Sequence, residues 1–297
     1  MKLLQADKLI LGLLAHPIKH SYSPFIHNMS AEILNIDMVY LPFDVLSSGL
    51  KDAMKGIRAL GINGFNVSIP HKEQIIKYLD GLSEEASFIG AVNTVVNDHG
   101  TLTGFNTDYF GIVDSLNPYK DIFSGEEVAM FGAGGASRAV ILALIRNYRP
   151  KRIHLINRTE QRAETLREHF RNLLGYDGIS VHEYFPPNLK KILLNSSLII
   201  NTTPVGMHPL EEDSIIETAD FISSSSVVFD MVYNPLETKL LRFASEAGAK
   251  TVGGLNMLVS QAAKSFELWT GAEMPKEIIT KVLTEKVLEN GTEKVTG

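Results

Sequence analysis

Two polar segments carry side chains that could exchange a proton with a ligand. Residues 66–73 (NVSIPHKE) run off a strand expected over 64–69 and bring Lys72, and residues 104–108 (GFNTD) bring Asp108 at the end of another strand. Polar groups at the carboxyl ends of strands face the crevice in which α/β proteins bind ligands. A carbonyl that accepts a hydride needs a proton on its oxygen, and a lysine held by a carboxylate can donate that proton and take it back in reverse. We therefore take Lys72 and Asp108 as a candidate catalytic pair.

Each member of the pair also has an ordinary structural explanation. Lys72 would be an exposed lysine on a helix expected over 70–79, although a cation in the first helical turn faces the positive end of the helix dipole. Asp108, or Thr107 before it, would be a normal cap for the helix that follows. The two structural explanations are weaker when they are taken together. If Asp108 pairs with Lys72, its carboxylate would orient the ammonium group and offset the unfavourable helix dipole.

Three further polar side chains lie where a hydroxylated acid could bind. Ser21 and Ser23, in residues 20–24 (HSYSP), offer hydroxyls and the start of a helix to a carboxylate. Asn93, in residues 90–94 (GAVNT), lies at the start of an expected strand and can bind a ligand hydroxyl. A cap or turn hydrogen bond explains each of the three equally well.

A glycine-rich turn, residues 132–138 (GAGGASR), joins a strand expected over 128–131 to a helix expected over 136–148. Small residues let the chain turn tightly and let a pyrophosphate approach the backbone, and the helix N-terminus adds free N–H groups. Ser137 replaces the third glycine of the usual pattern, which suits a helix and strand that pack a little less closely. The context favours a dinucleotide site over a turn without a ligand.

The end of the next expected strand indicates which dinucleotide binds. An NAD site usually has an acidic residue there for the ribose 2′-hydroxyl, whereas this chain has residues 157–159 (NRT). The guanidinium of Arg158 can hold a 2′-phosphate with two parallel hydrogen bonds, and Arg162 lies one helical turn further on. We therefore expect NADP(H). The alternatives are that Arg158 is an ordinary solvated residue, or that Glu160 binds the ribose.

The elements that must position these residues follow an α/β pattern. Expected strands over 9–15, 39–45 and 64–69 alternate with helices from Ser23, over 50–60 and over 70–79, and a hairpin over 92–96 and 102–105 follows. Later strands, separated by helical patterns, predict a parallel sheet covered on both faces. Helices over 255–269 and 276–288 end the chain, and we expect boundaries near 110 and 250. The later strands are expected over 128–131, 153–156, 180–183, 198–201, 227–231 and 250–252.

Composition excludes several classes of protein. The 297 residues are 44% hydrophobic and 21% charged, as in a soluble globular protein. The net charge of −6 is spread evenly, which argues against a nucleic-acid or anionic-membrane surface, and no apolar run approaches the length of a membrane helix. The chain has no cysteine, which excludes disulfides and thiolate sites. Pro17 interrupts the His16 and His20 spacing, so we expect no catalytic metal.

Further motifs occur in the second half of the chain: residues 201–207 (NTTPVGM), 230–235 (DMVYNP) and 253–258 (GGLNML), followed by Gln261. Together with the motifs above, and in the same order almost from end to end, they resemble the shikimate dehydrogenase family. The resemblance implies reversible, NADPH-dependent reduction of 3-dehydroshikimate to shikimate, in the shikimate pathway of aromatic amino-acid biosynthesis. It also implies a substrate lobe, residues 1–110 with the helices of 251–297 returning to it, and a Rossmann-type NADP-binding lobe, residues 111–250.

Residue roles also follow from the resemblance. Lys72 and Asp108 would form the catalytic pair. Substrate contacts are implied for Ser21 and Ser23 at the carboxylate, for Ser68, Asn93 and Gln261 at ring hydroxyls, for Tyr233 nearby, and for Lys72 and Asp108 themselves. Cofactor contacts are implied for Gly132, Ala133, Gly134, Gly135, Ala136, Asn157, Arg158, Thr159, Thr202, Met207 and Gly254, with Thr202 and Met207 along the nicotinamide. Ser68 stands where the family usually has threonine, so discrimination between shikimate and quinate is in question.

Two other functions stay open at this stage. One is a quinate/shikimate dehydrogenase that uses NAD, and the other is a non-catalytic module that senses a dinucleotide; a sensor would not need Lys72 and Asp108. We expect a small-molecule substrate as the partner, with no nucleic acid and no membrane. We also expect a cytoplasmic monomer or homodimer.

Overall fold

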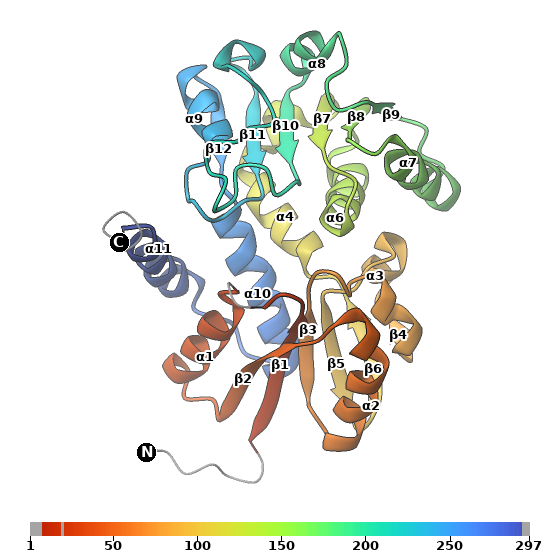
Figure 1. Cartoon of the computed structure of the whole chain (residues 1–297), viewed down its shortest axis with the longest axis vertical. Coiled ribbons are helices and arrows are strands. Elements are labelled where there is room, and N and C mark those ends of the chain that lie inside the picture. Colours follow the sequence, from red (N-terminus) through yellow and green to blue (C-terminus); the bar gives the residue numbers. More distant parts are fainter. Residues whose placement is uncertain (1–7, 19–20, 293–297) are drawn as a thin grey trace. The chain divides into compact units, whose positions relative to one another are not determined.

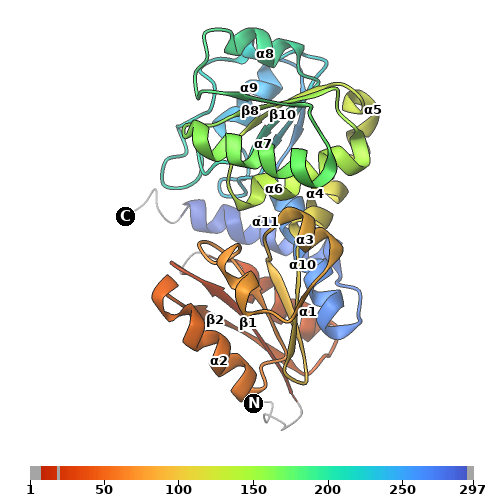
Figure 2. The same cartoon turned by 90° about the vertical axis from the view of Figure 1, so that its right-hand side faces the viewer.

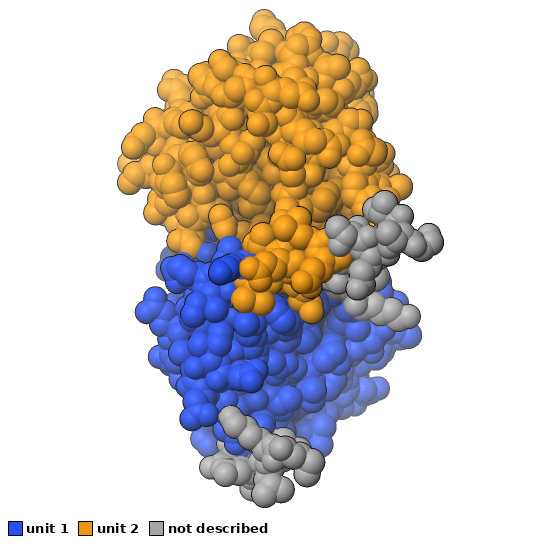
Figure 3. Space-filling view, turned by 90° about the vertical axis from the view of Figure 1, so that its left-hand side faces the viewer, with its two compact units in different colours: residues 1–111, 259–281 blue, residues 112–258, 282–297 orange. Residues whose placement is uncertain are grey.

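The computed structural model describes residues 8–18 and 21–292. The chain divides into two compact units: unit 1 is Met1–Gly111 with Val259–Lys281, and unit 2 is Ile112–Leu258 with Val282–Gly297 (Figure 3). The divisions fall inside the helices α4 (Asp108–Leu116), α10 (Gly254–Thr270) and α11 (Lys276–Thr292). The first division lies beside the boundary expected near 110, and unit 1 takes up Val259–Lys281 again; the expected lobe bounds stay predictions.

Unit 1 is built on a mixed six-stranded sheet in the order β2-β1-β3-β5-β6-β4 (Figure 1). Strand β1 lies between β2 and β3 and is parallel to both, whereas β5 and β6 form the antiparallel hairpin that the turn at Asp98–Gly100 predicts. The strands are β1 (Leu9–Ala15), β2 (Met38–Asp44), β3 (Gly64–Val67), β4 (Gly81–Leu82), β5 (Thr94–Asp98) and β6 (Thr101–Phe105).

Helices cover both faces of the unit 1 sheet (Figure 2). On one face lies α2 (Leu50–Leu60), whose apolar residues Leu50, Met54 and Ile57 pack with Phe65 of β3. On the other face lie α1 (Ser23–Ile33) and the part of α10 that belongs to unit 1. The short helix α3 (Glu84–Ile89), capped by the Ser83 side chain, links β4 to β5.

The prediction of a helix over residues 70–79 is wrong. Residues 70–73 form turns, and only Gln74–Tyr78 form a 3-10 helix. The carbonyl of Lys72 accepts a hydrogen bond of 2.8 Å from the backbone N–H of Val92, so it is used by another segment instead of a helical turn. Lys72 therefore does not lie in the first turn of a helix, and the dipole argument does not apply to it.

Unit 2 contains a fully parallel six-stranded sheet in the order β12-β11-β10-β7-β8-β9. Read from β9, this is the order 3-2-1-4-5-6 of the doubly wound dinucleotide-binding fold, so the expected α/β class and Rossmann-type sheet are confirmed. The strands are β7 (Glu127–Phe131), β8 (Arg152–Ile156), β9 (Ile179–His182), β10 (Leu198–Asn201), β11 (Val227–Asp230) and β12 (Lys250–Val252).

Helices lie on both faces of this sheet as well. Figure 2 shows α6 (Gly135–Ala143) and α7 (Glu160–Leu174) in front of the sheet and α9 (Lys239–Glu246) behind it. The side of α9 also carries α8 (Leu189–Asn195), and both bury apolar residues against β7, β10 and β11. The short α5 (Lys120–Phe123) precedes β7. Helix α6 is shorter than expected, because Leu144–Tyr148 continue it as a π-helical turn. Among the described residues, no helix is long and apolar enough to cross a bilayer.

Candidate active site

Unit 1 brings Lys72 and Asp108 into contact. The ammonium Nζ of Lys72 donates to Oδ2 of Asp108 over 2.5 Å, and the two side chains are 19% and 8% exposed. Lys72 comes from the turn after β3, and Asp108 is the first residue of α4, directly after β6. The partly exposed ammonium group can therefore reach a ligand while a nearly buried carboxylate holds it in place.

Asn93 fixes the other oxygen of this carboxylate. Its Nδ2 donates to Oδ1 of Asp108 and to Oγ1 of Thr107, each over 2.9 Å. Its Oδ1 accepts from the backbone N–H of Thr107 over 2.7 Å, and this bond determines which end of the amide faces Asp108. Gln261 on α10 lies beside them, with Oε1 3.4 Å from Nδ2 of Asn93. Four of the expected site residues thus form one cluster.

The three expected serines lie elsewhere in the same unit and are partly buried. Ser21 Oγ accepts from the backbone N–H of Ser23 over 3.2 Å. Ser23 was expected to cap α1, but Tyr22 occupies the cap position and Ser23 is the first helical residue, followed by Pro24. Ser68 lies just past the end of β3, where its N–H donates to the carbonyl of Leu14. His20 of the same motif lies outside the described residues.

A buried polar network behind the cluster was not found from the sequence. Asn66 on β3 donates through Nδ2 to the hydroxyls of Thr94 and Ser265, and its Oδ1 accepts from the hydroxyl of Tyr40 over 2.7 Å. Burial raises the pKa of Tyr40 well above its usual value, so this phenol stays protonated and donates. The sequence signal was that Asn66 interrupts an apolar strand, where an unpaired amide would be costly.

In unit 2 the glycine-rich turn lies between β7 and α6, next to the end of β10. Gly132 has φ of +107°, and a Cβ there would lie 2.4 Å from Oγ1 of Thr202, so glycine is required. Ser137 Oγ accepts from the N–H of Gly134 over 3.0 Å and lies 2.7 Å from Oγ1 of Thr202. The serine in the third glycine position therefore ties the turn to β10, at the place where the strand order reverses and ligands of this fold bind.

The turn fits a dinucleotide. A Cβ built on Gly134 would meet no other atom within 4 Å, so the backbone there faces open space that a pyrophosphate can enter. Gly135 begins α6, whose first N–H groups point toward an anion at this position. Ala133 and Ala136 complete the turn with small side chains. These residues would hold the pyrophosphate, and bound NADP(H) would supply the hydride.

The segment after β8 offers a cation for the nucleotide. Arg158 is exposed, and Nδ2 of Asn157 donates to the carbonyl of Thr159 over 2.7 Å, which shapes the loop before α7. Burial raises the pKa of Tyr184, whereas the nearby Arg158 guanidinium acts in the opposite direction. Glu160, the first residue of α7, is exposed too. The structure thus leaves Arg158 available for a 2′-phosphate.

A buried aspartate organises the loops after β10 and β11. Asp230 accepts from Nδ2 of Asn201 over 3.0 Å and from the hydroxyl of Thr238 over 2.6 Å. Burial raises the pKa of Asp230 to about 6. Asn201 in turn accepts from the backbone and hydroxyl of Thr203, so Asp230 supports the loop that carries Thr202.

The remaining three expected residues differ in their surroundings. Gly254 begins α10 and is tightly packed, since a Cβ there would lie 2.3 Å from the carbonyl oxygen of Met231. Tyr233 is partly buried, and Met207 is 44% exposed. Packing alone therefore accounts for glycine at position 254, and its contact with a cofactor stays a prediction.

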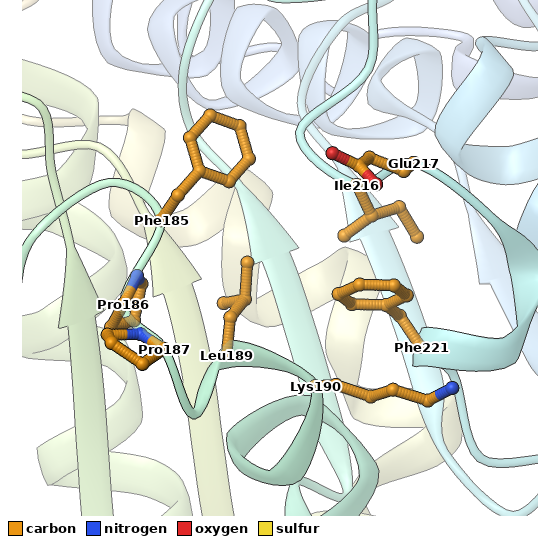
Figure 4. Close-up of a pocket in the computed structure, with 8 residues that line it drawn as sticks. All are labelled: Phe185, Pro186, Pro187, Leu189, Lys190, Ile216, Glu217 and Phe221. Carbon is orange, nitrogen blue, oxygen red and sulfur yellow. The ribbon is translucent and has the colours of Figure 1, made fainter.

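A separate cavity of about 170 Å³ lies in unit 2 (Figure 4). Phe185 and Phe221 face it, and Lys190 extends beside Phe221 with its ammonium 5.6 Å from the ring centroid. None of the expected site residues lines this cavity. Within residues 8–18 and 21–292, no group of three or more acidic or histidine side chains could hold a metal ion.

The chain is similar to proteins of a known family. A model of the shikimate dehydrogenase substrate binding domain matches residues 13–95, and a model of the shikimate 5'-dehydrogenase C-terminal domain matches residues 254–284. A shikimate dehydrogenase (NADP(+)) from Caldanaerobacter subterraneus subsp. tengcongensis is 44% identical over 91% of this chain and 94% of its own length. The chain belongs to the shikimate dehydrogenase family.

Solved structures of similar proteins have the same fold. Shikimate 5-dehydrogenase from Listeria monocytogenes, in complex with shikimate and NAD, is 39% identical with a TM-score of 0.87, over 95% of this chain and 99% of that one. Quinate dehydrogenase from Corynebacterium glutamicum, in complex with NAD, is 28% identical with a TM-score of 0.85, over 94% and 99%. The similarity to these structures therefore includes both sheets and nearly the whole chain.

Proposed function

We propose that the protein catalyses the reversible, NADPH-dependent reduction of 3-dehydroshikimate to shikimate, a step of the shikimate pathway. The observation that carries the proposal is the 2.5 Å contact of Lys72 with Asp108, with Asn93 bound to the second carboxylate oxygen. Membership of the family and the open glycine turn of unit 2 support the same reaction and NADP(H) as the cofactor.

The side chains of unit 1 supply the proton. The Lys72 ammonium donates a proton to the carbonyl oxygen of the substrate as hydride reaches the carbon, and the amine takes it back during oxidation. Asp108 orients the ammonium group and balances its charge. Asn93 holds the carboxylate, so its Oδ2 stays directed at Lys72.

The other roles are proposals of the same kind. Ser21 and Ser23 bind the substrate carboxylate, with Tyr233 nearby, and Ser68, Asn93 and Gln261 bind ring hydroxyls. For the cofactor, Gly132–Ala136 hold the pyrophosphate, and Asn157, Arg158 and Thr159 hold the 2′-phosphate side. Thr202 and Met207 line the nicotinamide side, and Gly254 also contacts the cofactor. The monomeric or homodimeric state, the absence of nucleic-acid or membrane partners, and the cytoplasmic location stay predictions.

A second reading is a quinate/shikimate dehydrogenase that uses NAD. The quinate dehydrogenase of the same fold and the serine at position 68 favour it. Ser68 keeps the hydroxyl of the usual threonine but lacks its methyl group, which leaves more room beside the ring. Arg158 argues for NADP(H), because a guanidinium binds a 2′-phosphate better than a 2′-hydroxyl.

Nicotinamide absorbance at equal concentrations of shikimate or quinate, with NADP+ or NAD+, tests the proposal. We expect the highest kcat/KM for shikimate with NADP+. Preference for quinate with NAD+ would favour the second reading. Nucleotide binding with no turnover of either acid would favour a sensing module and contradict the proposed reaction.

A further inference from the structure

The cluster of hydroxyls behind the site centres on Ser265 of α10. Its side chain is fully buried, and its Oγ lies 2.8 Å from Oγ1 of Thr94 and 3.0 Å from Oγ1 of Thr107. The same Oγ accepts from Nδ2 of Asn66 over 3.1 Å and can donate to the carbonyl of Gln261, also over 3.1 Å. One hydroxyl thus joins β3, β5, α10 and the residue before Asp108.

Groups that donate hydrogen bonds to the amide oxygens determine how the amides of Asn66 and Asn93 are oriented. Tyr40 donates to Oδ1 of Asn66, so the Nδ2 of Asn66 must face the hydroxyls as a donor. Thr107 N–H donates to Oδ1 of Asn93, which receives a second bond from Thr94 over 3.0 Å. Asn93 can then offer only N–H groups to Thr107 and Asp108.

The same logic sets Gln261. Its Oε1 lies 3.4 Å from both Nδ2 of Asn93 and Oγ1 of Thr107, and the amide nitrogen of Asn93 can only donate to it. The oxygen therefore faces the cluster, and Nε2 lies on the other branch of the amide. Ser265 lies one helical turn after Gln261. It can accept the hydroxyl proton of Thr107 and give its own single proton to Thr94 or to the carbonyl of Gln261, so it holds Thr107 in place beside the Gln261 side chain.

We propose that Ser265 is a positioning residue: its hydroxyl holds Thr94 and Thr107, which orient Asn93 and Gln261 for the substrate hydroxyls. The inference rests on the proposed function, because it concerns how the same site recognises shikimate. Within the described residues, Ser265 makes no hydrogen bond to Lys72 or Asp108. It therefore acts on substrate binding through its neighbours.

Ser30 offers a matched control. It is also a fully buried serine on a helix of unit 1, and its Oγ donates to the carbonyl four residues earlier, Ile26, over 2.7 Å, as Ser265 can to Gln261. It makes no hydrogen bond to the site residues named here. Ser30→Ala and Ser265→Ala therefore remove the same group from similar surroundings, and only the second alters the hydroxyl cluster.

The test is steady-state kinetics of shikimate oxidation with NADP+, with thermal melting recorded alongside. For Ser265→Ala we expect about a tenfold fall in kcat/KM for shikimate, equal to about 1.4 kcal/mol, mostly through KM. The KM for NADP+ should stay within about twofold. Ser30→Ala should lower the melting temperature similarly and leave both KM values unchanged. Equal kinetics of the two variants would overturn the inference.

If Ser265→Ala does not fold, a second pair of variants, at Thr94, tests the role of the hydroxyl cluster. Thr94→Val keeps the shape of the side chain without its hydroxyl, and Thr94→Ser keeps the hydroxyl. We expect the KM for shikimate to rise in Thr94→Val and to recover in Thr94→Ser; matching values in both would contradict the proposal. Failure of the proposed function is distinguishable, because the unmodified protein would then not oxidise shikimate at all.

Discussion

His27 of α1 is a buried histidine enclosed by aromatic side chains. It is fully buried, and neither of its ring nitrogens has a hydrogen-bond partner. Its ring stacks on Tyr40 with centroids 4.5 Å apart and lies 5.2 Å from the ring of Trp269. Burial lowers the pKa of His27 from 6.5 to about 3. Below pH 6.5 the unfolded chain takes up a proton that the folded chain refuses, so stability falls as pH falls toward 3.

We therefore expect His27→Leu to reduce the acid sensitivity of unit 1. Between pH 8 and pH 5, loss of this one histidine should shrink the drop in unfolding free energy by about 2 kcal/mol. The chain has one tryptophan, Trp269, which packs near His27, so urea unfolding followed by its fluorescence reports on this core. His99→Asn, at a fully exposed side chain, serves as the control. An unchanged pH dependence in His27→Leu would rule out this explanation.

Some polar side chains of the site could be predicted from the sequence, and others could not. Lys72, Asp108, Asn93 and Gln261 were expected from their motifs, and the structure places them in one cluster. The hydroxyl cluster was not expected, because Ser265 and its partner Thr94 are 171 residues apart and each looks like an ordinary polar residue. Such pairings depend on tertiary packing, which no local pattern encodes.

At the scale of elements, the sequence predicted the ends of strands and helices correctly where neighbouring residues determine them. Strands Leu9–Ala15 and Leu198–Asn201 and helix Leu50–Leu60 have the expected limits, the helix ending at Gly61 with φ of +66°. The failure at residues 70–79 has a non-local cause, the bond from Val92 to the Lys72 carbonyl. The expected strand over 92–96 likewise begins later, at Thr94, because Val92 and Asn93 bond outside the regular ladder.

The strand–turn–helix element of unit 2 gives a prediction at its own scale. Gly134 has an ordinary extended conformation, with φ of −98°, and faces open space, so Gly134→Ala should fold normally. Its methyl group would occupy the space through which a pyrophosphate approaches, and we expect the KM for NADP+ to rise about tenfold, equal to about 1.4 kcal/mol. Kinetics and thermal melting measure the two effects separately.

Gly132→Ala is the matched comparison. At φ of +107° and 2.4 Å from Thr202, the added Cβ strains the turn itself, so both the melting temperature and NADP+ binding should fall. If Gly134→Ala binds NADP+ as well as the unmodified protein does, the turn is not the pyrophosphate site.

At the scale of the whole molecule, the proposed function assigns different parts of the reaction to the two units. The proposed proton-transfer pair belongs to unit 1, and the glycine turn with Arg158 belongs to unit 2. The sequence motifs indicated both parts. The division inside α4 falls beside the boundary expected near 110, whereas the divisions inside α10 and α11 were not predicted, because helical periodicity continues unchanged through them. A variant can therefore lose proton transfer while nucleotide binding remains.

Lys72→Ala tests the central claim most directly, with NADP+ affinity and turnover of shikimate measured on the same protein. Lys8→Ala is the control, since Lys8 also pairs with an aspartate of unit 1, Asp37, at 2.8 Å, but lies outside the proposed site. We expect Lys72→Ala to bind NADP+ normally and to lose about 10²–10⁴-fold in kcat, while Lys8→Ala keeps full turnover. Turnover in Lys72→Ala within threefold of the Lys8→Ala rate would contradict the account.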